Sequence, residues 1–522
     1  MSALKRYGYP VWIAFLVGMA LLHAIHLSAD FPNFSPWQDW AKYTDEGWYG
    51  NAAVRAHLFH NWYLPGDFNP APAVPLWPLL EWLLFFVTGV SITAARGLAV
   101  GFFLLNLALS YKLFRERGPR WAGLLLVTLL VTSPFLYSFS RLAILEPMLV
   151  TLTLVAMNLA IRLPRFRHQE AVAALIGLIF TAMMLTKTTA VFLLPALVWA
   201  MLFEFRHHVR PMLRLLVATG GSAVLSFSLW MFLVVNADLF DDYKYLFFIN
   251  TYEKAHGVYG RLMSFWWSFH GGLWIDPFLI PLSGVLIVGA AACWRQRWTN
   301  GLWRDPLFGS SVLAVAGYIG FMTYQNHPQP RYYTVVAFFG FIVVVRVMAQ
   351  LLYQPERIRR YGLAIIAVVA VSLAVNTVWT IRYALDPQYT FVEAARTLTR
   401  YIDQHPNGNR LLVSISGDDI TLITHLPTLC DDFGTMSLPA KTAFYQPGWY
   451  ATWNDFDPGT LEDLHAHFTL EQVASFRAFD DPERNVLYLF KLHPLPGGMT
   501  RNPAEPAMHT ILPGDKILIP VE

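Results

Sequence analysis

Ionisable residues beside or inside apolar segments are the first candidates for chemistry in this sequence. Asp45 and Glu46 follow the first apolar segment, and Glu146 lies inside the run LAILEPMLV. Lys187 and Arg331 stand at the ends of later apolar segments. A charge at the centre of a bilayer costs about 2.5 to 3.5 kcal/mol on insertion scales, so each of these residues needs a reason. Carboxylates suit a general base, and lysine and arginine stabilise negative charge. The residue types therefore predict a polar cavity for an anionic substrate.

Apolar segments of bilayer length must position these charged residues. The chain has 522 residues, of which 55% are hydrophobic and 14% are charged, against about 25% charged in a typical soluble protein. A spanning helix needs roughly 20 apolar residues. The composition excludes a single water-soluble globule and predicts an all-α polytopic protein of the inner (cell) membrane. Eleven spans are predicted, at 10–29, 94–114, 121–140, 142–161, 171–186, 188–204, 215–235, 277–294, 306–324, 332–353 and 362–383.

Clusters of Lys and Arg in short loops predict how the chain is oriented. Such residues collect on the cytoplasmic side, and they occur here at 5–6, 112–120, 162–167, 206–214, 295–304 and 357–360. The N-terminus is therefore predicted inside, and the loops 30–92 and 236–276 and everything after residue 386 are predicted outside. If the apolar segment 75–91 crossed the membrane, all the later Lys and Arg clusters would lie on the outer side. It is interpreted as a juxtamembrane helix whose Glu81 faces the headgroups.

The chain after residue 386 has a different composition from the rest. A capping-type helix at about 390–404 and the strand-like runs RLLVSISG and NVLYLFKL predict a small extracytoplasmic α/β domain over 387–522, after a transmembrane domain over 1–386. Cys293 and Cys430 fall on opposite sides of the bilayer in this topology, so neither a disulfide nor a thiolate metal site is predicted. A net charge of +3 without a basic patch predicts no nucleic-acid partner.

The predicted topology brings further polar residues to the same outer face. The candidates for substrate binding are Arg96, Arg141, Lys187, His256, Arg261, Arg331 and Tyr332. Each candidate has a structural alternative. Arg96, Lys187 and Arg331 can be headgroup anchors, Glu146 can pair with Arg141, and His256 and Arg261 can lie on a solvated loop surface. Asp45 can cap the helix that follows it, although Thr44 suits that position too.

Five segments resemble the GT-C glycosyltransferases, in the branch that contains bacterial protein O-mannosyltransferases and lipid A aminoarabinose transferases. They are YTDEGWYGNAAVRA at 43–56, FNPAPAVPLWPLLEW, SRLAILEPMLV at 140–150, MLTKTTAVFLLP at 184–195 and HPQPRYY at 327–333. The resemblance implies a transferase that takes a sugar from a polyprenyl phosphate or diphosphate. The acceptor, which can be a lipid, a glycan or a protein, lies outside the cytoplasm.

The resemblance also implies roles for individual residues. Asp45 is the implied catalytic base with Glu46 beside it, Glu146 is the second acid of the cavity, and Lys187 and Arg331 contact the phosphate. One base implies direct displacement with inversion at the anomeric carbon. Aminoarabinose transferases carry a Glu-Lys-Pro where this chain has FNP at 68–70, so one phosphate-binding lysine is missing and that substrate is not supported.

Two questions stay open at this point. Asp45 and Glu146 can alternatively hold a divalent cation such as magnesium or manganese, since carboxylate oxygens suit these ions, although no obligatory metal is predicted. The same charges can line the path of a transporter or flippase. Transporters commonly show paired repeats and midplane sites, which this sequence does not show. A non-catalytic scaffold would leave Glu146 unexplained.

Overall fold

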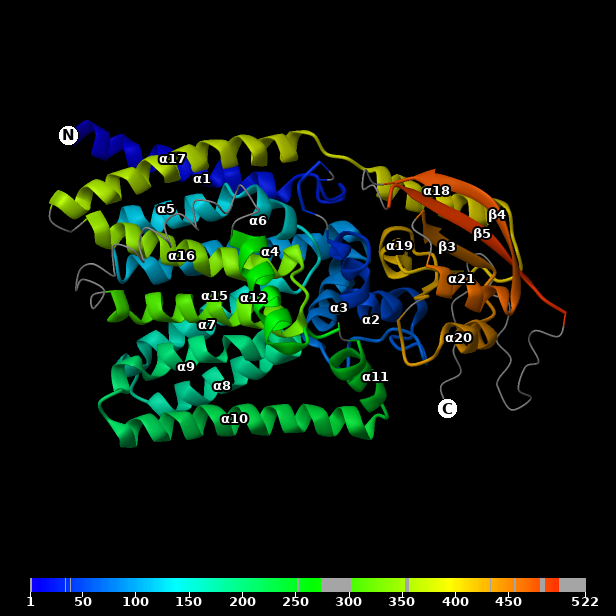
Figure 1. The fold of residues 1–522 in the computed structure, drawn as a ribbon, viewed down its shortest axis with the longest axis horizontal. Helices are drawn as coiled ribbons and strands as arrows, with labels where there is room; N and C mark the ends of the chain where they lie inside the picture. Colours follow the sequence, from blue (N-terminus) through cyan, green and yellow to red (C-terminus); the bar gives the residue numbers. More distant parts are fainter. Residues whose placement is uncertain are drawn as a thin grey trace.

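The computed structural model describes residues 2–496 except 33, 38, 251–252, 274–301, 353–355, 432, 455–456 and 479–483. The chain forms a long helical bundle with a mixed α/β domain at one end, and short helices lie between these two parts (Figure 1). The predicted fold class, an all-α membrane protein with a small C-terminal sheet domain, is confirmed. The predicted segment 277–294 and Cys293 lie outside the described residues.

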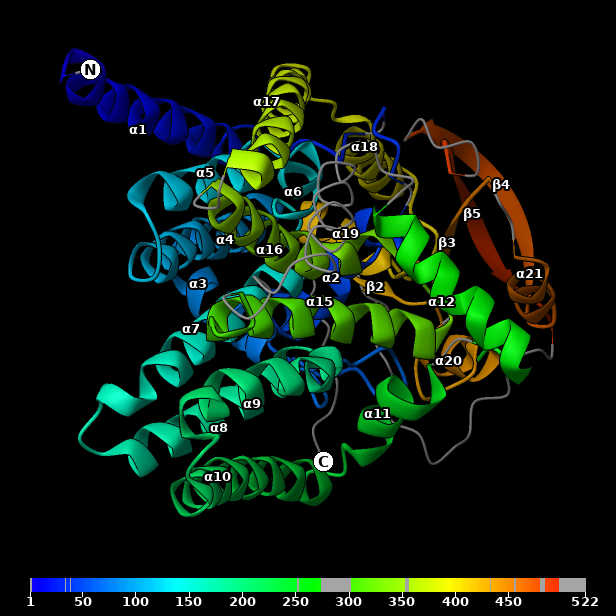
Figure 2. The same cartoon turned by 60° about the vertical axis from the view of Figure 1, so that its left-hand side comes forward.

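The helices of the bundle run along its length. They are α1 (Ser2–Ala24), α4 (Ile92–Arg115), α5 (Arg120–Val131), α6 (Pro134–Phe139), α7 (Glu146–Arg162), α8 (Gln169–Thr186), α9 (Leu194–Leu202), α10 (Val209–Asn236), α15 (Pro306–Gln325), α16 (Tyr333–Leu352) and α17 (Glu356–Leu385). Helix α16 is apolar all round and buried along nearly its whole length, as expected of a helix inside a bundle. Helix α10 lies at the edge in two views (Figures 1 and 2) and buries only Leu215 and Val234.

Eight helices among the described residues are long and apolar enough to cross a membrane. They match eight of the predicted spans. Two further predicted spans, 10–29 and 121–140, correspond to shorter apolar helices, Gly8–Ala24 and Arg120–Val131. The multi-pass architecture is therefore confirmed, while the number of crossings stays a prediction.

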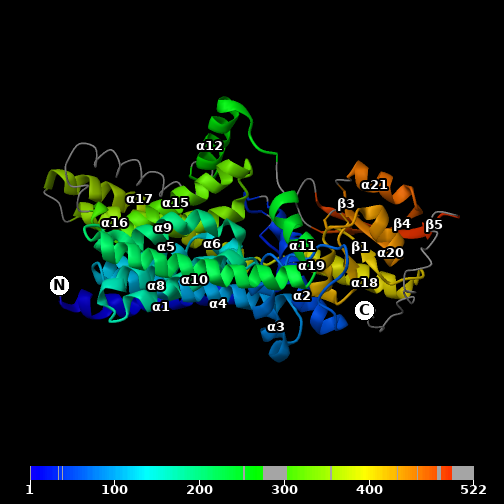
Figure 3. The same cartoon turned by 90° about the horizontal axis from the view of Figure 1, so that it is seen from below.

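Short helices, most of them in the predicted outer loops, gather at the end of the bundle that meets the α/β domain. They are the 3₁₀ helices η1 (Trp40–Lys42), η3 (Thr188–Leu193) and η6 (Pro330–Tyr332), the α-helices α2 (Asp45–Phe59), α3 (Leu76–Thr88), α11 (Phe240–Lys244) and α12 (Gly257–Leu273), and the π-helix η5 (Tyr245–Ile249). Helix α2 lies between the bundle and the α/β domain, and α12 projects from one side of the bundle (Figure 3). The site described below is built around α2.

Helix α3 corrects one prediction from the sequence. Glu81 does not face the headgroups: it is fully buried and lies against α2, where a Cβ on Gly50 would come within 2.0 Å of Glu81 Oε2. The residues that α3 exposes are apolar, among them Phe86 at 65% and Val87 at 87%. A helix on a membrane surface turns its apolar face to lipid, so the polar side of α3 is the side that packs on the protein.

The C-terminal domain is built on a five-stranded sheet with the order β2-β1-β3-β5-β4. Strands β1 (Leu412–Val413), β2 (Thr428–Leu429) and β3 (Trp449–Trp453) are parallel, and β4 (Phe468–Arg477) and β5 (Val486–Pro494) add to β3 as an antiparallel pair. The helices of the domain are α18 (Thr390–Gln404), α19 (Gly417–Thr424), α20 (Leu438–Tyr445) and α21 (Pro458–His465). The predicted helix at 390–404 and the two predicted strands are confirmed.

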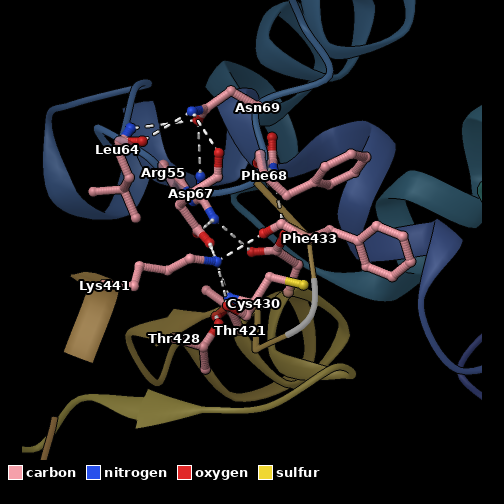
Figure 4. Close-up of polar contacts among 12 residues, drawn as sticks. Arg55, Leu64, Asp67, Phe68, Asn69, Thr421, Thr428, Cys430, Phe433 and Lys441 are labelled. Atoms are coloured by element: carbon pink, nitrogen blue, oxygen red, sulfur yellow. Dashed lines mark hydrogen bonds and ion pairs between the residues drawn. The ribbon is translucent and has the colours of Figure 1, made fainter. Parts of the chain in front are cut away.

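A buried ionic network fastens the C-terminal domain to the loop that follows α2 (Figure 4). Arg55 Nη2 lies 2.7 Å from Asp67 Oδ2 and 3.0 Å from Asp418 Oδ1. Lys441 donates to the carbonyl oxygens of Cys430 at 2.6 Å and Phe433 at 2.7 Å, and its Nζ lies 3.2 Å from Asp67 Oδ1. Removing one partner of such a buried network leaves the others without compensation. The network therefore joins the C-terminal domain to α2 and to the loop that follows it.

Replacing Lys441 with methionine is expected to destabilise the protein by about 1.5 to 3 kcal/mol, because two carbonyls and one carboxylate lose a charged donor. The midpoint of thermal unfolding of the detergent-solubilised protein measures this change. Lys244→Met is the matched control, since Lys244 pairs with Asp241 at the surface, where ion pairs contribute little. Equal midpoints for the two variants would contradict the expectation.

Candidate active site

Asp45 is the first residue of α2 and is buried, with 2% of its surface exposed. Thr44 occupies the N-cap position, so Asp45 is not itself the cap. The Thr44 hydroxyl lies 3.0 Å from the Trp40 carbonyl oxygen and 3.3 Å from Asp45 Oδ1. Arg331 Nε lies 3.0 Å from Asp45 Oδ2. The carboxylate that the sequence singled out is therefore held against a buried guanidinium.

Arg331 is shared with a second carboxylate that the sequence analysis missed. Its backbone N–H donates to Asp39 Oδ2 at 2.8 Å, and its Nη1 forms an ion pair with Asp39 Oδ1. Asp39 also caps η1 by accepting from Ala41 N. It stands in the polar stretch after the first apolar segment with no motif around it, so only its position in the predicted outer loop pointed to it. Arg331 therefore lies between two carboxylates, those of Asp39 and Asp45.

Glu146 and Lys187 form the second ion pair of the site. Glu146 begins α7, Lys187 precedes η3, and Lys187 Nζ lies 2.6 Å from Glu146 Oε1. The Lys187 ammonium lies 4.9 Å from the ring centroid of Tyr332 and 5.8 Å from that of Tyr49. The predicted alternative, a pair of Glu146 with Arg141, is wrong, because Glu146 pairs with Lys187, which lies between α8 and η3.

The two ion pairs act on Asp45 together. Burial raises the pKa of the Asp45 carboxyl above its ordinary value, while Arg331 and Lys187 lower it and Asp39 and Glu146 raise it. The net direction is upward. A raised pKa brings a carboxylate closer to the pH at which general-base catalysis is most effective.

Glu46 and Arg96 fasten the first turn of α2 to the bundle. Arg96 Nε lies 2.7 Å from Glu46 Oε1, and Arg96 Nη2 lies 2.5 Å from Glu46 Oε2, so the pair is bidentate. Glu46 Oε1 also accepts from Ala143 N at 2.8 Å, and Arg96 Nη1 donates to the Leu27 carbonyl oxygen at 2.9 Å. Both residues have their hydrogen-bonding groups engaged by protein. Their geometry suits positioning of α2.

Three predicted site residues lie apart from this arrangement. Arg141 donates to the carbonyl oxygens of Ile25 and His26, each at 2.6 Å, and stacks over Tyr137. His256 and Arg261 are exposed, just before and within α12. Within the part of the chain that the structure describes, no hydrogen bond or ion pair joins any of the three to Asp45, Glu146, Lys187 or Arg331. A substrate-binding role for them stays a prediction.

An apolar cavity of about 620 Å³ lies beside the site, between α2, α3, α8 and α10. Its lining includes Trp62, Leu79, Trp82, Leu185 and Trp230. Leu185 stands two residues before Lys187 in the chain, so the cavity adjoins the hairpin that carries the buried ammonium. Residues 185–187 therefore contribute both part of the lining of an apolar cavity and a buried cation.

No group of three or more His, Cys, Asp or Glu side chains in the described ranges is arranged to hold a metal ion. Asp45 and Glu146, the predicted alternative ligands for magnesium or manganese, each face a protein cation instead. Whether a divalent cation takes part stays a prediction.

The bundle, the short helices at its end and the C-terminal sheet domain together have a fold that is shared with solved GT-C membrane glycosyltransferases. The model of the family described as dolichyl-phosphate-mannose-protein mannosyltransferase matches residues 70–230. ArnT from Cupriavidus metallidurans in the apo state is 14% identical, with a TM-score of 0.60 over 92% of this chain and 98% of that chain. ArnT bound to undecaprenyl phosphate has a TM-score of 0.59, also at 14% identity over 92% and 98% of the two chains.

A third solved structure is more distant. The oligosaccharyltransferase of Archaeoglobus fulgidus in complex with Zn and sulfate is 11% identical, with a TM-score of 0.50 over 93% of this chain and 74% of that chain. A search of curated proteins finds no match. At these identities the structures show a shared fold, and with the family model they confirm the predicted resemblance to GT-C glycosyltransferases.

Proposed function

We propose that this protein transfers a sugar from a polyprenyl-phosphate carrier to an acceptor on the outer side of the membrane. The observation that carries the proposal is the juxtaposition of one buried carboxylate, Asp45, with the cations of Arg331 and Lys187. The apolar cavity beside Lys187 supports it, because a polyprenyl chain needs an apolar channel. A structural relative, ArnT, has been crystallised with undecaprenyl phosphate.

In the proposed reaction Asp45 takes the proton of an acceptor hydroxyl. The hydroxyl oxygen then forms a bond to the anomeric carbon, and the bond from that carbon to the phosphate oxygen breaks. The electron pair leaves with the phosphate, so negative charge grows there and Lys187 and Arg331 stabilise it. Attack opposite to the leaving group inverts the anomeric carbon. A single base within hydrogen-bonding distance of the acceptor suffices for this step.

The carboxylates that pair with the two cations have a part in the proposal. In the structure Glu146 holds Lys187, and Asp39 holds Arg331. These pairs keep two buried cations compensated while no phosphate is present, since an unpaired buried charge is costly. An incoming phosphate supplies the negative charge that each cation needs. Asp45 is then released from Arg331 to accept the proton.

The lipid that copurifies with the protein tests the proposal. Mass spectrometry of the extracted lipids is expected to find a polyprenyl phosphate, with or without a sugar. Incubation with the sugar-loaded carrier and extracted envelope acceptors is then expected to release the free carrier phosphate. Carrier binding without any transfer, together with movement of the carrier between leaflets of a vesicle, would favour a flippase instead.

The pH dependence of transfer provides a further prediction. Because the base must be ionised and burial raises the pKa of the Asp45 carboxyl above its ordinary value, kcat/KM is expected to fall with acidification at a higher pH than it would for an ordinary aspartate. The Asp39→Asn variant removes a neighbouring negative charge that raises this pKa, so its acidic limb is expected at lower pH than that of the wild type. Profiles of kcat/KM against pH for the wild type and for Asp39→Asn measure the acidic limb of each protein. An upward shift in the variant would contradict the assignment.

We propose, on the pattern of Lys and Arg clusters alone, that the C-terminal domain and Asp45 lie on the outer side of the inner membrane. A reporter fused after Glu522 that works only outside the cytoplasm is expected to be active. Activity of a reporter that works only inside would reverse the orientation.

A further inference from the structure

The N-terminus of α2, where Asp45 stands, is not capped by the side chain of the preceding residue. The first N–H groups of a helix lack partners within the helix, and the side chain at the N-cap position usually accepts one of them. Thr44 holds the N-cap position but makes no capping hydrogen bond. Its hydroxyl is directed to the Trp40 carbonyl oxygen and to the carboxylate of Asp45.

The C-terminal domain supplies the missing acceptor. Asp419, in the first turn of α19, accepts a hydrogen bond through Oδ1 from the backbone N–H of Gly47. Gly47 is the third residue of α2, and its N–H is one of those that an N-cap side chain ordinarily satisfies. Both residues are buried. The acceptor and the donor are 372 residues apart in the chain.

Gly47 itself is required for this contact. A Cβ at position 47 would lie 2.2 Å from the backbone carbon of Asp418 and 2.3 Å from the backbone nitrogen of Asp419. These atoms belong to the backbone of α19, which cannot turn aside as a side chain can. The two helices can therefore approach this closely only because residue 47 has no side chain.

Further down α2, Asp418 holds the same two helices together. Its Oδ2 accepts from Asn51 Nδ2 at 3.1 Å, and its Oδ1 accepts from Arg55 Nη2 at 3.0 Å. Asn51 and Arg55 follow Gly47 at steps of four residues, so the three stand on one face of α2. The two adjacent carboxyls of α19 therefore bind different parts of α2. Asp418 binds the middle of the helix through Asn51 and Arg55, and Asp419 binds its first turn through Gly47.

Three consecutive residues at the start of α2 are held by three different parts of the protein. Asp45 faces Arg331 of η6, Glu46 is paired with Arg96 of α4, and the Gly47 N–H is bound by Asp419 of the outer domain. One of these anchors comes from the bundle, one from the short helices at its end and one from the C-terminal domain.

We propose that Asp419 is a positioning residue, which caps α2 from the C-terminal domain and thereby fixes the Asp45 carboxylate for proton transfer. The inference rests on the proposed function, because it assumes that Asp45 is the base. It assigns the C-terminal domain a direct part in the reaction. A base displaced by about 1 Å can lose about 10²-fold in rate, so the cap affects turnover more than donor binding.

The state of the Asp419 carboxyl determines which substitution preserves the cap. Burial raises its pKa well above the ordinary value, and the neighbouring Glu46 raises it further. The Asp419 carboxyl accepts the Gly47 N–H through one oxygen, Oδ1, and an asparagine amide offers an oxygen of the same shape and position. Asparagine at position 419 is therefore expected to preserve the cap, whereas leucine, of similar size, offers no acceptor.

The test compares Asp419→Leu with Asp419→Asn in the full-length, detergent-solubilised protein. Asp419→Leu is expected to lower kcat by about 10- to 100-fold with the donor KM changed less than about twofold, and Asp419→Asn is expected to keep kcat near the wild type. Hydrogen exchange at the Gly47 amide is expected to accelerate in Asp419→Leu alone. His425→Asn is the matched control, since it removes a different contact of the same domain, to the Val90 carbonyl oxygen.

A second variant disturbs the same contact from the side of α2. Gly47→Ala keeps Asp419, favours helix formation in isolation, and pushes α19 away from α2. It is expected to lower kcat as Asp419→Leu does. Wild-type kcat in Asp419→Leu, or equal losses in Asp419→Leu and Asp419→Asn, would overturn the inference. An inactive Asp45→Asn beside a fully active Asp419→Leu would leave the proposed function standing, whereas a fully active Asp45→Asn would remove the proposed function itself.

Discussion

Replacing Asp45 with asparagine is expected to lower the rate of sugar transfer by about 10²- to 10⁴-fold, the range that a general base contributes. The amide keeps the shape of the side chain but cannot take the acceptor proton. Arg331 stays compensated in the variant because Asp39 still pairs with it. The protein is therefore expected to fold, insert and bind its donor. Transfer from a sugar-loaded polyprenyl phosphate, measured under single-turnover conditions, checks the rate.

The control for this variant is Asp241→Asn. Asp241 is an acid in a predicted outer loop, with 78% of its side chain exposed and a surface partner in Lys244. This change is expected to leave transfer unaltered. Full activity of Asp45→Asn would contradict the assignment of Asp45 as the base. Asp39 and Glu146, which lie in the same set of ion pairs, would then be the candidate bases.

Replacing Lys187 with methionine is expected to raise the donor KM by about 10- to 100-fold, because a charge-assisted contact to phosphate is worth about 1.5 to 3 kcal/mol. Lys187 is buried beside the aromatic rings of Tyr332 and Tyr49, and it follows Leu185, which lines the apolar cavity, by two residues. Initial rates at increasing concentrations of the lipid-linked donor measure the change.

The single variant also leaves the buried carboxylate of Glu146 without its partner, at a cost of about 3 to 5 kcal/mol. The double variant Glu146→Gln with Lys187→Met removes both charges and is expected to recover most of that stability. It is not expected to recover donor affinity. A double variant with wild-type donor KM would show that Lys187 serves the fold and not the phosphate.

The sequence pointed to most residues of the candidate site because charged residues inside or directly beside apolar segments are rare. Asp45, Glu146, Lys187 and Arg331 stood out in this way, and the structure brings them into neighbouring ion pairs. Asp39 did not stand out, since a polar loop gives an aspartate no distinction. The outward orientation assigned to Glu81 was wrong because an apolar helix does not reveal which of its faces meets lipid and which meets protein.

The contribution of the C-terminal domain was not predictable from local pattern. Asp418 and Asp419 lie in a short polar segment that resembles an ordinary helix start. Their partners Gly47, Asn51 and Arg55 stand more than 360 residues earlier. No spacing rule relates two segments so far apart, because their contact follows from how the domain docks on α2.

The sequence by itself determined the helical membrane architecture, the α/β character of the last domain and the end of the bundle at which the candidate site lies. These properties depend on the length and composition of single segments, which act locally. Only the tertiary structure decided which charge faces which: Glu146 with Lys187, Arg331 between two aspartates, and Asp419 on the first turn of α2. Partners in a buried network are chosen by packing among distant segments, and the requirement that each buried charge be compensated selects the pairs.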